Sequence, residues 1–314
     1  MHILTVNQAE QGMKLLNFLS RRLENSAPSG ELHRWIRSGQ VRINGKRAHA
    51  FDRLVAGDSV RLPPFAGDAA RQDAADIVVA PNEDLGHGLR ILVAAPDFLA
   101  LEKPSGLPSQ PGSKQDADVT GLLRQRFATS PYIPAPAHRL DKKTSGILLA
   151  GRTHEAQEKL HALFARHDGD DVKKTYLAWV LGTFPYDGEH VLTDFLAKEA
   201  DAGTRFERVR AVSKEAGKEA KSRVSLVETR KTPLGPASLV RIVLETGRTH
   251  QIRVQLAIRN LPIIGDLKYK GLAYPLMLLH AHSLAFPWKG KTVALTSLPE
   301  WPEAFAVASA PFVA

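Results

Sequence analysis

The stretch FAGDAARQDAADIVVAPNEDLGHG, residues 65–88, limits the architecture of this 314-residue chain more than any other segment. It is rich in Ala, Asp and Gly, holds few large apolar residues and carries a net charge of −4. This composition is typical of a linker between folded units. We therefore expect a small unit over residues 1–64, an acidic linker over 65–88 and a body over 89–314.

Both expected units are basic. Residues 1–64 carry ten Lys/Arg against five Asp/Glu, and because the whole chain carries +9, the residues after the linker carry +8. Two basic units around an acidic strip indicate a polyanionic partner such as nucleic acid, although an ordinary basic surface would show the same balance.

Composition also excludes several classes of protein. Cysteine is absent, so disulfides, thiolate nucleophiles and cysteine-based metal sites are excluded. No apolar run has the length of a membrane span, and the start of the chain lacks the pattern of a signal peptide. We expect a cytoplasmic protein with no membrane partner.

The first unit has the pattern of two short helices followed by a hairpin. Apolar residues recur at helical spacing in GMKLLNFLSRRLEN and again in SGELHRWIRSGQ, where Gly39 ends the second helix. In VRINGKRA, the pair Asn44-Gly45 predicts a tight hairpin turn, and LVAGDSVRLPP predicts a closing strand. The residues expected to face the core are Leu15, Phe18, Leu19, Leu23, Leu32, Trp35 and Ile36.

The order of these segments over residues 13–64 resembles that of an S4-type RNA-binding domain. The resemblance implies that a basic face contacts the phosphates of folded RNA. The residues expected there are Arg34, Arg37, Arg42, Lys46 and Arg47. A solvated basic helix face is the plainer alternative.

The body alternates strand and helix patterns, which predicts an α/β body built on a mixed sheet. KKTYLAWVLG is apolar on both faces and is expected to be a central strand. THEAQEKLHALFARHD predicts a helix that begins after Thr153, and ASLVRIVLETGRTHQIRVQLAIRN predicts a strand, a turn and a helix that begins after Thr249. GILLAGRT and LLHAHSLAFPW predict further strands.

The stretch AHRLDKKTSGILLAGRT, residues 137–153, places Asp141 at a turn before an apolar strand. An aspartate that acts as a nucleophile or base must be ionised, and a nearby arginine favours the ionised form. Arg139 is close in sequence, while TGRTHQIR supplies Arg248 and Arg253 from a distant segment. An isolated Arg–Asp pair is more often structural than catalytic, so residue types alone leave the role of Asp141 open.

The order EKPSGLPSQPG, HRLDKKTSG, KKTYLAWVLG, TGRTHQIRVQ and LLHAHSLAFP resembles that of the RluA-type RNA pseudouridine synthases over roughly residues 90–305. The resemblance implies an α+β body whose central sheet is mixed, mostly antiparallel and flanked by helices. It implies isomerisation of uridine to pseudouridine in RNA without a metal, a nucleotide or another cofactor. With an S4-like unit ahead of such a body, the chain most resembles the RluC-type subgroup that modifies 23S ribosomal RNA of the large subunit.

The resemblance also assigns roles at matching positions. It makes Asp141 the catalytic aspartate, Arg253 the arginine paired with it, and Tyr176 the aromatic that stacks on the target base and is a candidate for proton transfer at C5. Arg139 is expected to act in nucleotide flipping or to fill the gap that the flipped base leaves. His138, Arg248, His250 and Gln251 are expected to support or bind the substrate. Gln255 departs from the family pattern HQIRVH, and we expect it to act only indirectly.

Several alternatives stay open from the sequence. Asp141 could add to C6 of uracil, attack C1′, or help to form a glycal. A non-catalytic RNA-binding or ribosome-assembly protein on the same fold, or a synthase that acts on tRNA, would share these motifs. A kinase-like use of HRLD lacks the following Asn and the glycine-rich loop, and HExxH-type metal spacing is absent from the sequence. We expect a monomer.

Overall fold

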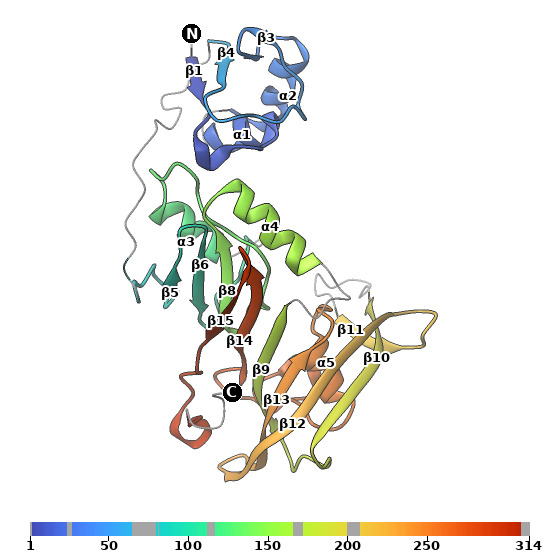
Figure 1. The fold of residues 1–314 in the computed structure, drawn as a ribbon. Helices are drawn as coiled ribbons and strands as arrows, with labels where there is room; N and C mark the ends of the chain where they lie inside the picture. The colour runs from blue at the N-terminus through green and yellow to red at the C-terminus, as the bar shows by residue number, and fades with distance from the viewer. Residues whose placement is uncertain are drawn as a thin grey trace.

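The computed structural model describes residues 2–23, 27–64, 80, 82–111, 117–165, 172–199 and 208–308. These residues form two separate sheets, a small one at the N-terminus and a long one that runs through the body (Figure 1). None of the helices in these ranges has the length and apolarity that a membrane span requires.

The N-terminal unit packs two helices on a four-stranded antiparallel sheet of order β1-β4-β2-β3. All seven residues expected to face its core are buried, as helical periodicity predicted. Asn44 and Gly45 both have positive φ, as the predicted hairpin turn requires. The elements are β1 (His2–Thr5), η1 (Gln8–Glu10), α1 (Leu15–Arg22), α2 (Ser29–Arg37), β2 (Arg42–Ile43), β3 (Lys46–Arg47) and β4 (Ser59–Leu62).

The body is built on an eleven-stranded sheet of order β11-β10-β12-β13-β9-β14-β8-β6-β5, with β15 on β14 and β7 on β8. Among the described strand pairs, only β8 and β14 run parallel, so the expected mixed, mostly antiparallel sheet is confirmed. The strands are β5 (Arg90–Ala94), β6 (Phe98–Lys103), β7 (Ala135–Pro136), β8 (Ser145–Gly151), β9 (Lys173–Leu181), β10 (Glu189–Glu199), β11 (Arg208–Val212), β12 (Lys218–Thr232), β13 (Gly235–Leu244), β14 (Leu279–Trp288) and β15 (Lys291–Thr296).

Strand β9 lies between β13 and β14, which confirms the central position predicted for KKTYLAWVLG. The helices of the body lie beside the sheet: α3 and α4 near β5, β6 and β8, and α5 near β10 and β13 (Figure 1). They are α3 (Val119–Arg126), α4 (His154–Ala165), α5 (Gln251–Ala257), η2 (Leu267–Tyr269) and η3 (Glu303–Phe305). Thr153 caps α4 as predicted, because its Oγ1 accepts a hydrogen bond from the N–H of Ala156.

Two expectations change in the structure. Residues 82–88, assigned above to the linker, are hydrogen-bonded to the start of the body, with the N–H of Asn82 donating to Ile91 O and the N–H of Ile91 to Glu83 O. The body therefore begins by residue 82, whereas 65–79 and 81 lie outside the described residues. The predicted cap Thr249 is also wrong: α5 begins after His250, which has a left-handed backbone.

The N-terminal unit contacts the body at the loop that follows α3. Tyr132 of this loop is buried in the core of the N-terminal unit, and the guanidinium of Arg21 lies 4.3 Å from the centre of its ring. Asn7 Nδ2 donates to Pro131 O at 3.1 Å. These contacts hold the N-terminal unit against the end of the body that carries α3 and α4 (Figure 1).

Candidate active site

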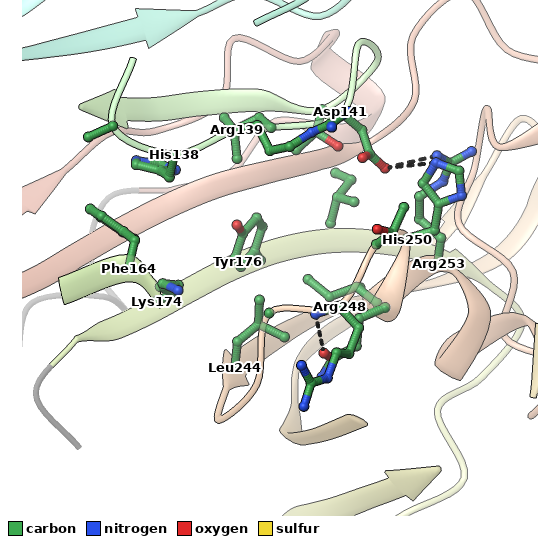
Figure 2. Close-up of a pocket in the computed structure, with 18 of the residues that line it drawn as sticks. His138, Arg139, Asp141, Phe164, Lys174, Tyr176, Leu244, Arg248, His250 and Arg253 are labelled. Carbon is green, nitrogen blue, oxygen red and sulfur yellow. Dashed lines mark hydrogen bonds and ion pairs between the residues drawn. The ribbon is translucent and has the colours of Figure 1, made fainter. Parts of the chain in front are cut away.

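A cavity of about 470 Å³ opens between the loop before β8, the end of α4, strand β9 and the turn before α5. Its volume lies within the range of small-molecule pockets, about 300–1,000 Å³. All three residues expected to be catalytic line it, together with His138, Arg139, Arg248, His250 and Gln251. The fold thus brings together segments that are more than 100 residues apart in sequence (Figure 2).

Asp141 projects into this cavity from the loop that precedes β8, with 23% of its side chain exposed. Arg253 NH1 donates to Asp141 Oδ2 at 2.9 Å, and Figure 2 shows the two side chains pointing at each other across the cavity. His250 Nε2 lies 3.6 Å from the same oxygen. Burial lowers the pKa of His250 to about 4, against the charge of Asp141, so this imidazole is neutral near neutral pH.

Arg253 is shared between two carboxylates. Its Nε and NH2 donate to Asp266 Oδ2 and Oδ1 at 2.7 and 2.8 Å, while NH1 remains for Asp141. Burial alone lowers the pKa of Arg253, but the hydrogen bonds and charges of Asp266 and Asp141 outweigh it, and the net pKa is raised. Asp266 is almost fully buried. Because a two-pronged pair fixes the plane of the guanidinium, Asp266 sets the direction of the N–H that reaches Asp141.

A buried lysine holds the loop that carries Asp141. Lys103 Nζ, at the end of β6, donates to Pro104 O, Leu107 O and Lys142 O at 2.8, 2.7 and 3.1 Å. Burial lowers the pKa of Lys103 to about 7, while the charge of Asp141 opposes that change. Three carbonyl acceptors match the three N–H donors of an ammonium group. Lys103 therefore joins the 104–107 turn to the residue that follows Asp141.

The start of β8, just after the Asp141 loop, needs a glycine. Gly146 has φ +111°, and a Cβ there would lie 2.3 Å from Ala281 O of β14. That distance is far below any normal contact, so only glycine lets β8 start this close to its parallel partner. Gly146 thereby lets the start of β8 pair with Ala281 of β14 beside the Asp141 loop.

Tyr176 lies in the middle of the cavity, on the face of β9 that points toward Asp141 (Figure 2). Burial raises its pKa, and the charge of Asp141 raises it further. The phenol is therefore protonated near neutral pH. Leu244 and Leu279, from the neighbouring strands, also line the cavity and give it an apolar side next to the ring.

His138 supports the wall at the α4 end of the cavity. Its Nε2 accepts a hydrogen bond from the N–H of Leu149 at 3.1 Å, and its ring stacks on Phe164 at 4.2 Å. Burial, and then the charge of Lys174, lower its pKa to about 3, so it is neutral at physiological pH. His138 thus contacts β8 and Phe164, as well as preceding the Asp141 loop in sequence.

Gln251 and Arg248 shape the turn before α5. Gln251 Oε1 accepts from Thr246 Oγ1 and from the N–H of Arg248, and its Nε2 donates to Lys221 O. Arg248 Nε donates to Glu219 O at 2.8 Å. Both ends of the Gln251 amide are therefore used inside the protein, and they hold His250 in its left-handed conformation.

Arg139 is exposed at the edge of the cavity, next to Asp141 (Figure 2). Gln255 points the other way: it is fully buried and bonds Ser222, Asp194 and the backbone of β12, so it joins α5 to the sheet without lining the cavity. The five basic residues of the N-terminal unit are exposed and lie outside the cavity: Arg34, Arg37, Arg42, Lys46 and Arg47.

The sequence pattern of the family described as RNA pseudouridylate synthase matches residues 97–258 of the chain. That range includes Asp141, Tyr176 and Arg253. The chain belongs to this family.

Relatives over nearly the whole chain agree with the family. The protein is 32% identical over 306 residues to the ribosomal large subunit pseudouridine synthase C of Pasteurella multocida. The aligned region covers 94% of this chain and 89% of the relative. The protein of that name from Escherichia coli K12 is 33% identical over 301 residues, covering 92% and 89%. The human RNA pseudouridylate synthase domain containing 1 structure shares the fold, with a TM-score of 0.58 and 24% identity over 70% of this chain and 86% of that one.

The site of this RNA pseudouridine synthase also contains residues that the motifs did not single out. Asp266 follows Gly265 in LPIIGDLKY, and a Cβ at Gly265 would lie 2.0 Å from Leu276 O. Lys103 is a single cation at the end of an apolar strand, and Lys174 and Phe164 complete the far wall of the cavity. Lys103 and Asp266 each follow a run of buried apolar residues. A charged residue in that position needs a partner inside the fold, so this pattern is the sequence signal by which both can be found.

Proposed function

We propose that this pseudouridine synthase isomerises specific uridines of large-subunit ribosomal RNA, with Asp141 as the catalytic residue. The observation that carries the proposal is the carboxylate of Asp141, held by Arg253 beside Tyr176 in a cavity of nucleotide size. Ribosomal RNA as the substrate is supported by the names of the relatives that cover more than nine-tenths of the chain.

The reaction breaks the N1–C1′ bond, turns the base and forms a C5–C1′ bond, so the proton on C5 is lost and N1 gains one. The ionised carboxylate of Asp141 starts this sequence by adding to C6, by attacking C1′, or by assisting a glycal. The hydrogen bond from Arg253 keeps the carboxylate charged and aimed in each case. Each group in this scheme belongs to the protein or to the RNA, and no cofactor enters it.

The substrate base must leave its stack to reach the cavity, at a cost of a few kcal/mol. Tyr176 offsets part of that cost, because base–aromatic stacking contributes about 1–3 kcal/mol per base. We assign Arg139, exposed beside the cavity, to the space that the flipped nucleotide leaves. His138, Arg248, His250 and Gln251 shape the walls around the nucleotide.

We also propose that residues 1–64 are an S4-type RNA-binding domain that holds the ribosomal RNA while the body reacts. The support is the basic set Arg34, Arg37, Arg42, Lys46 and Arg47, all of which are exposed. The docking of Tyr132 in this unit would keep a constant distance between the two RNA contacts. We propose that the protein acts as a monomer in the cytoplasm.

The test is to map pseudouridines in ribosomal RNA from cells that lack the gene. The strain is then complemented with the wild-type chain, with Asp141→Ala, and with Asp194→Asn, a carboxylate that pairs with Arg259 outside the cavity. Sites that are restored by the wild type and Asp194→Asn but not by Asp141→Ala would support the proposal. If no ribosomal site is missing, tRNA is examined next, and unchanged tRNA would favour a protein that only binds RNA.

A further inference from the structure

The end of the cavity away from Asp141 holds a lysine without a counter-charge among the described residues. Lys174 lies on β9, and Figure 2 shows it beside Phe164, with Tyr176 between it and Asp141. Its Nζ lies 5.0 Å from the centre of the Phe164 ring. No carboxylate in the described part of the chain forms an ion pair with it, whereas Arg253 at the other end has two.

The surroundings of Lys174 do not compensate its charge. His138, in the same cavity wall, carries no charge near pH 7, because burial and the charge of Lys174 lower its pKa to about 3. Burial lowers the pKa of Lys174 itself, as it does for any ammonium group that leaves water. A cation in this position gains most from an anion that enters the cavity with a ligand.

The position of Lys174 relative to Tyr176 suggests what that anion is. The two residues are i and i+2 on β9, so they share one face of the strand and are spaced by about 6.8 Å along it. That is close to the reach from a base to the phosphate of its own nucleotide. The carboxylate of Asp141 would repel a phosphate at its own end of the cavity, so a nucleotide that stacks on Tyr176 is favoured with its phosphate toward Lys174.

The backbone next to Lys174 leaves room for such a group. Gly247, in the turn before α5, faces the lysine: a Cβ built there would lie 3.8 Å from Nζ. Because glycine has no side chain, position 247 places no side-chain atom on this side of the amine.

We propose that Lys174 binds a phosphate that flanks the flipped uridine and so fixes the direction in which the nucleotide enters the cavity. The inference rests on the proposed function, because it takes an RNA nucleotide as the occupant. In this scheme Lys174 positions the substrate, and Asp141 remains the catalytic residue.

The experiment combines variants of the protein with a neutral phosphate in the RNA. The probe is a single-stranded RNA of A and C with one central uridine, made in three forms: unmodified, or with a methylphosphonate on the 5′ or the 3′ side of that uridine. An unpaired uridine is used because it costs least to flip. Equilibrium binding is measured for the wild type, for Lys174→Met, for Lys174→Arg, which keeps the charge, and for Lys173→Met, the exposed neighbour on the other face of β9.

For the wild type and Lys173→Met, one of the two methylphosphonates should lower affinity about 10- to 100-fold, the range expected for a hydrogen bond to a charged group. Lys174→Met should bind the unmodified RNA about 10- to 100-fold more weakly than the wild type does. The same methylphosphonate should not lower the affinity of this variant any further. The salt slope of binding should fall by about 0.7 in this variant. Because Lys174→Arg keeps the positive charge, the methylphosphonate should still lower its RNA affinity, but by less than in the wild type.

The inference would be overturned if the methylphosphonate lowered the RNA affinity of Lys174→Met as much as that of the wild type. It would also be overturned if neither the 5′ nor the 3′ methylphosphonate changed the RNA affinity of the wild type. Pairing of Lys174 with a carboxylate of its own chain, of which the sequence has three at 168–171, would give the same negative result. The proposed function is tested separately, by pseudouridine formation on ribosomal RNA, so a synthase that is active but insensitive at Lys174 would sink only this inference. Thermal unfolding shows whether each variant is folded.

Discussion

Asp266→Asn tests whether the second carboxylate on Arg253 positions the first. Asp266 is almost fully buried and accepts two hydrogen bonds from Arg253, at 2.7 and 2.8 Å. Removing one partner of a buried ion pair costs about 3–5 kcal/mol of stability. Because Asp141 remains as a counter-charge and asparagine keeps one acceptor oxygen, we expect the lower end, about 3 kcal/mol.

The effect on catalysis follows from geometry. With one side of the guanidinium released, NH1 of Arg253 no longer has a fixed direction toward Asp141, and a misplacement of about 1 Å can cost about 100-fold in rate. We expect kcat to fall about 10- to 100-fold, with little change in the affinity for RNA. Urea unfolding gives the stability, and single-turnover pseudouridine formation on ribosomal RNA gives the rate.

Asp194→Asn is the matched control. Asp194 accepts hydrogen bonds from Arg259 at 2.9 and 3.2 Å near the other end of α5, outside the cavity. It should lose stability without a comparable loss in kcat. If Asp266→Asn loses stability but has the same kcat as Asp194→Asn, Asp266 only stabilises the fold and does not position Arg253. An equal loss of rate in both variants would also refute it.

Three further predictions follow from the same structure. Asp141→Ala should abolish turnover and leave RNA affinity within a few-fold of wild type; turnover near the wild-type rate would remove Asp141 from the reaction. Changing Arg34, Arg37, Arg42, Lys46 and Arg47 to Gln should weaken binding to folded ribosomal RNA and reduce the salt slope by up to about 4, since each lost phosphate contact contributes about 0.7–0.9; an unchanged slope would exclude these side chains from the interface. Burial lowers the pKa of His280 to about 3, below the unfolded value near 6.5. As the pH falls below 6.5 the unfolded chain binds a proton that the folded chain does not, so stability should fall by about 2 kcal/mol between pH 6.5 and 5 through this residue alone. His280→Asn should flatten the pH dependence measured by urea unfolding, and an equally steep decline would contradict the assignment.

The parts of the fold that were predicted well depend on signals within a few residues. The α1 and α2 faces follow from helical spacing, the hairpin turn from Asn44-Gly45, and the central place of β9 from apolar residues on both of its faces. The predicted start of α5 was wrong because it depends on contacts with a distant part of the chain. Thr249 has the right residue type for a cap, but hydrogen bonds from Gln251 to distant strand β12 hold the turn so that His250 precedes the helix instead.

Motif order predicted which residues meet in the cavity, but not how they meet. Residue types around Asp141 offered three arginines, and only the family resemblance favoured Arg253. The structure separates them physically: Arg253 reaches Asp141 at 2.9 Å, Arg248 is bonded to Glu219 O, and Arg139 is exposed. Asp141 and Arg253 are 112 positions apart in the sequence, and the chain between them carries no local signal of how close they come.

Local sequence patterns specify the helical faces, the tight turns, the basic character of both units and the motif set that marks the family. Only the tertiary structure shows that Asp266 and Asp141 share Arg253, that Lys103 bonds the Asp141 loop, and that no carboxylate of the described residues pairs with Lys174 in the cavity wall. The physical reason is that periodicity and turn chemistry act within one or two turns of chain. Charge pairing and burial depend on which distant faces the sheet brings together.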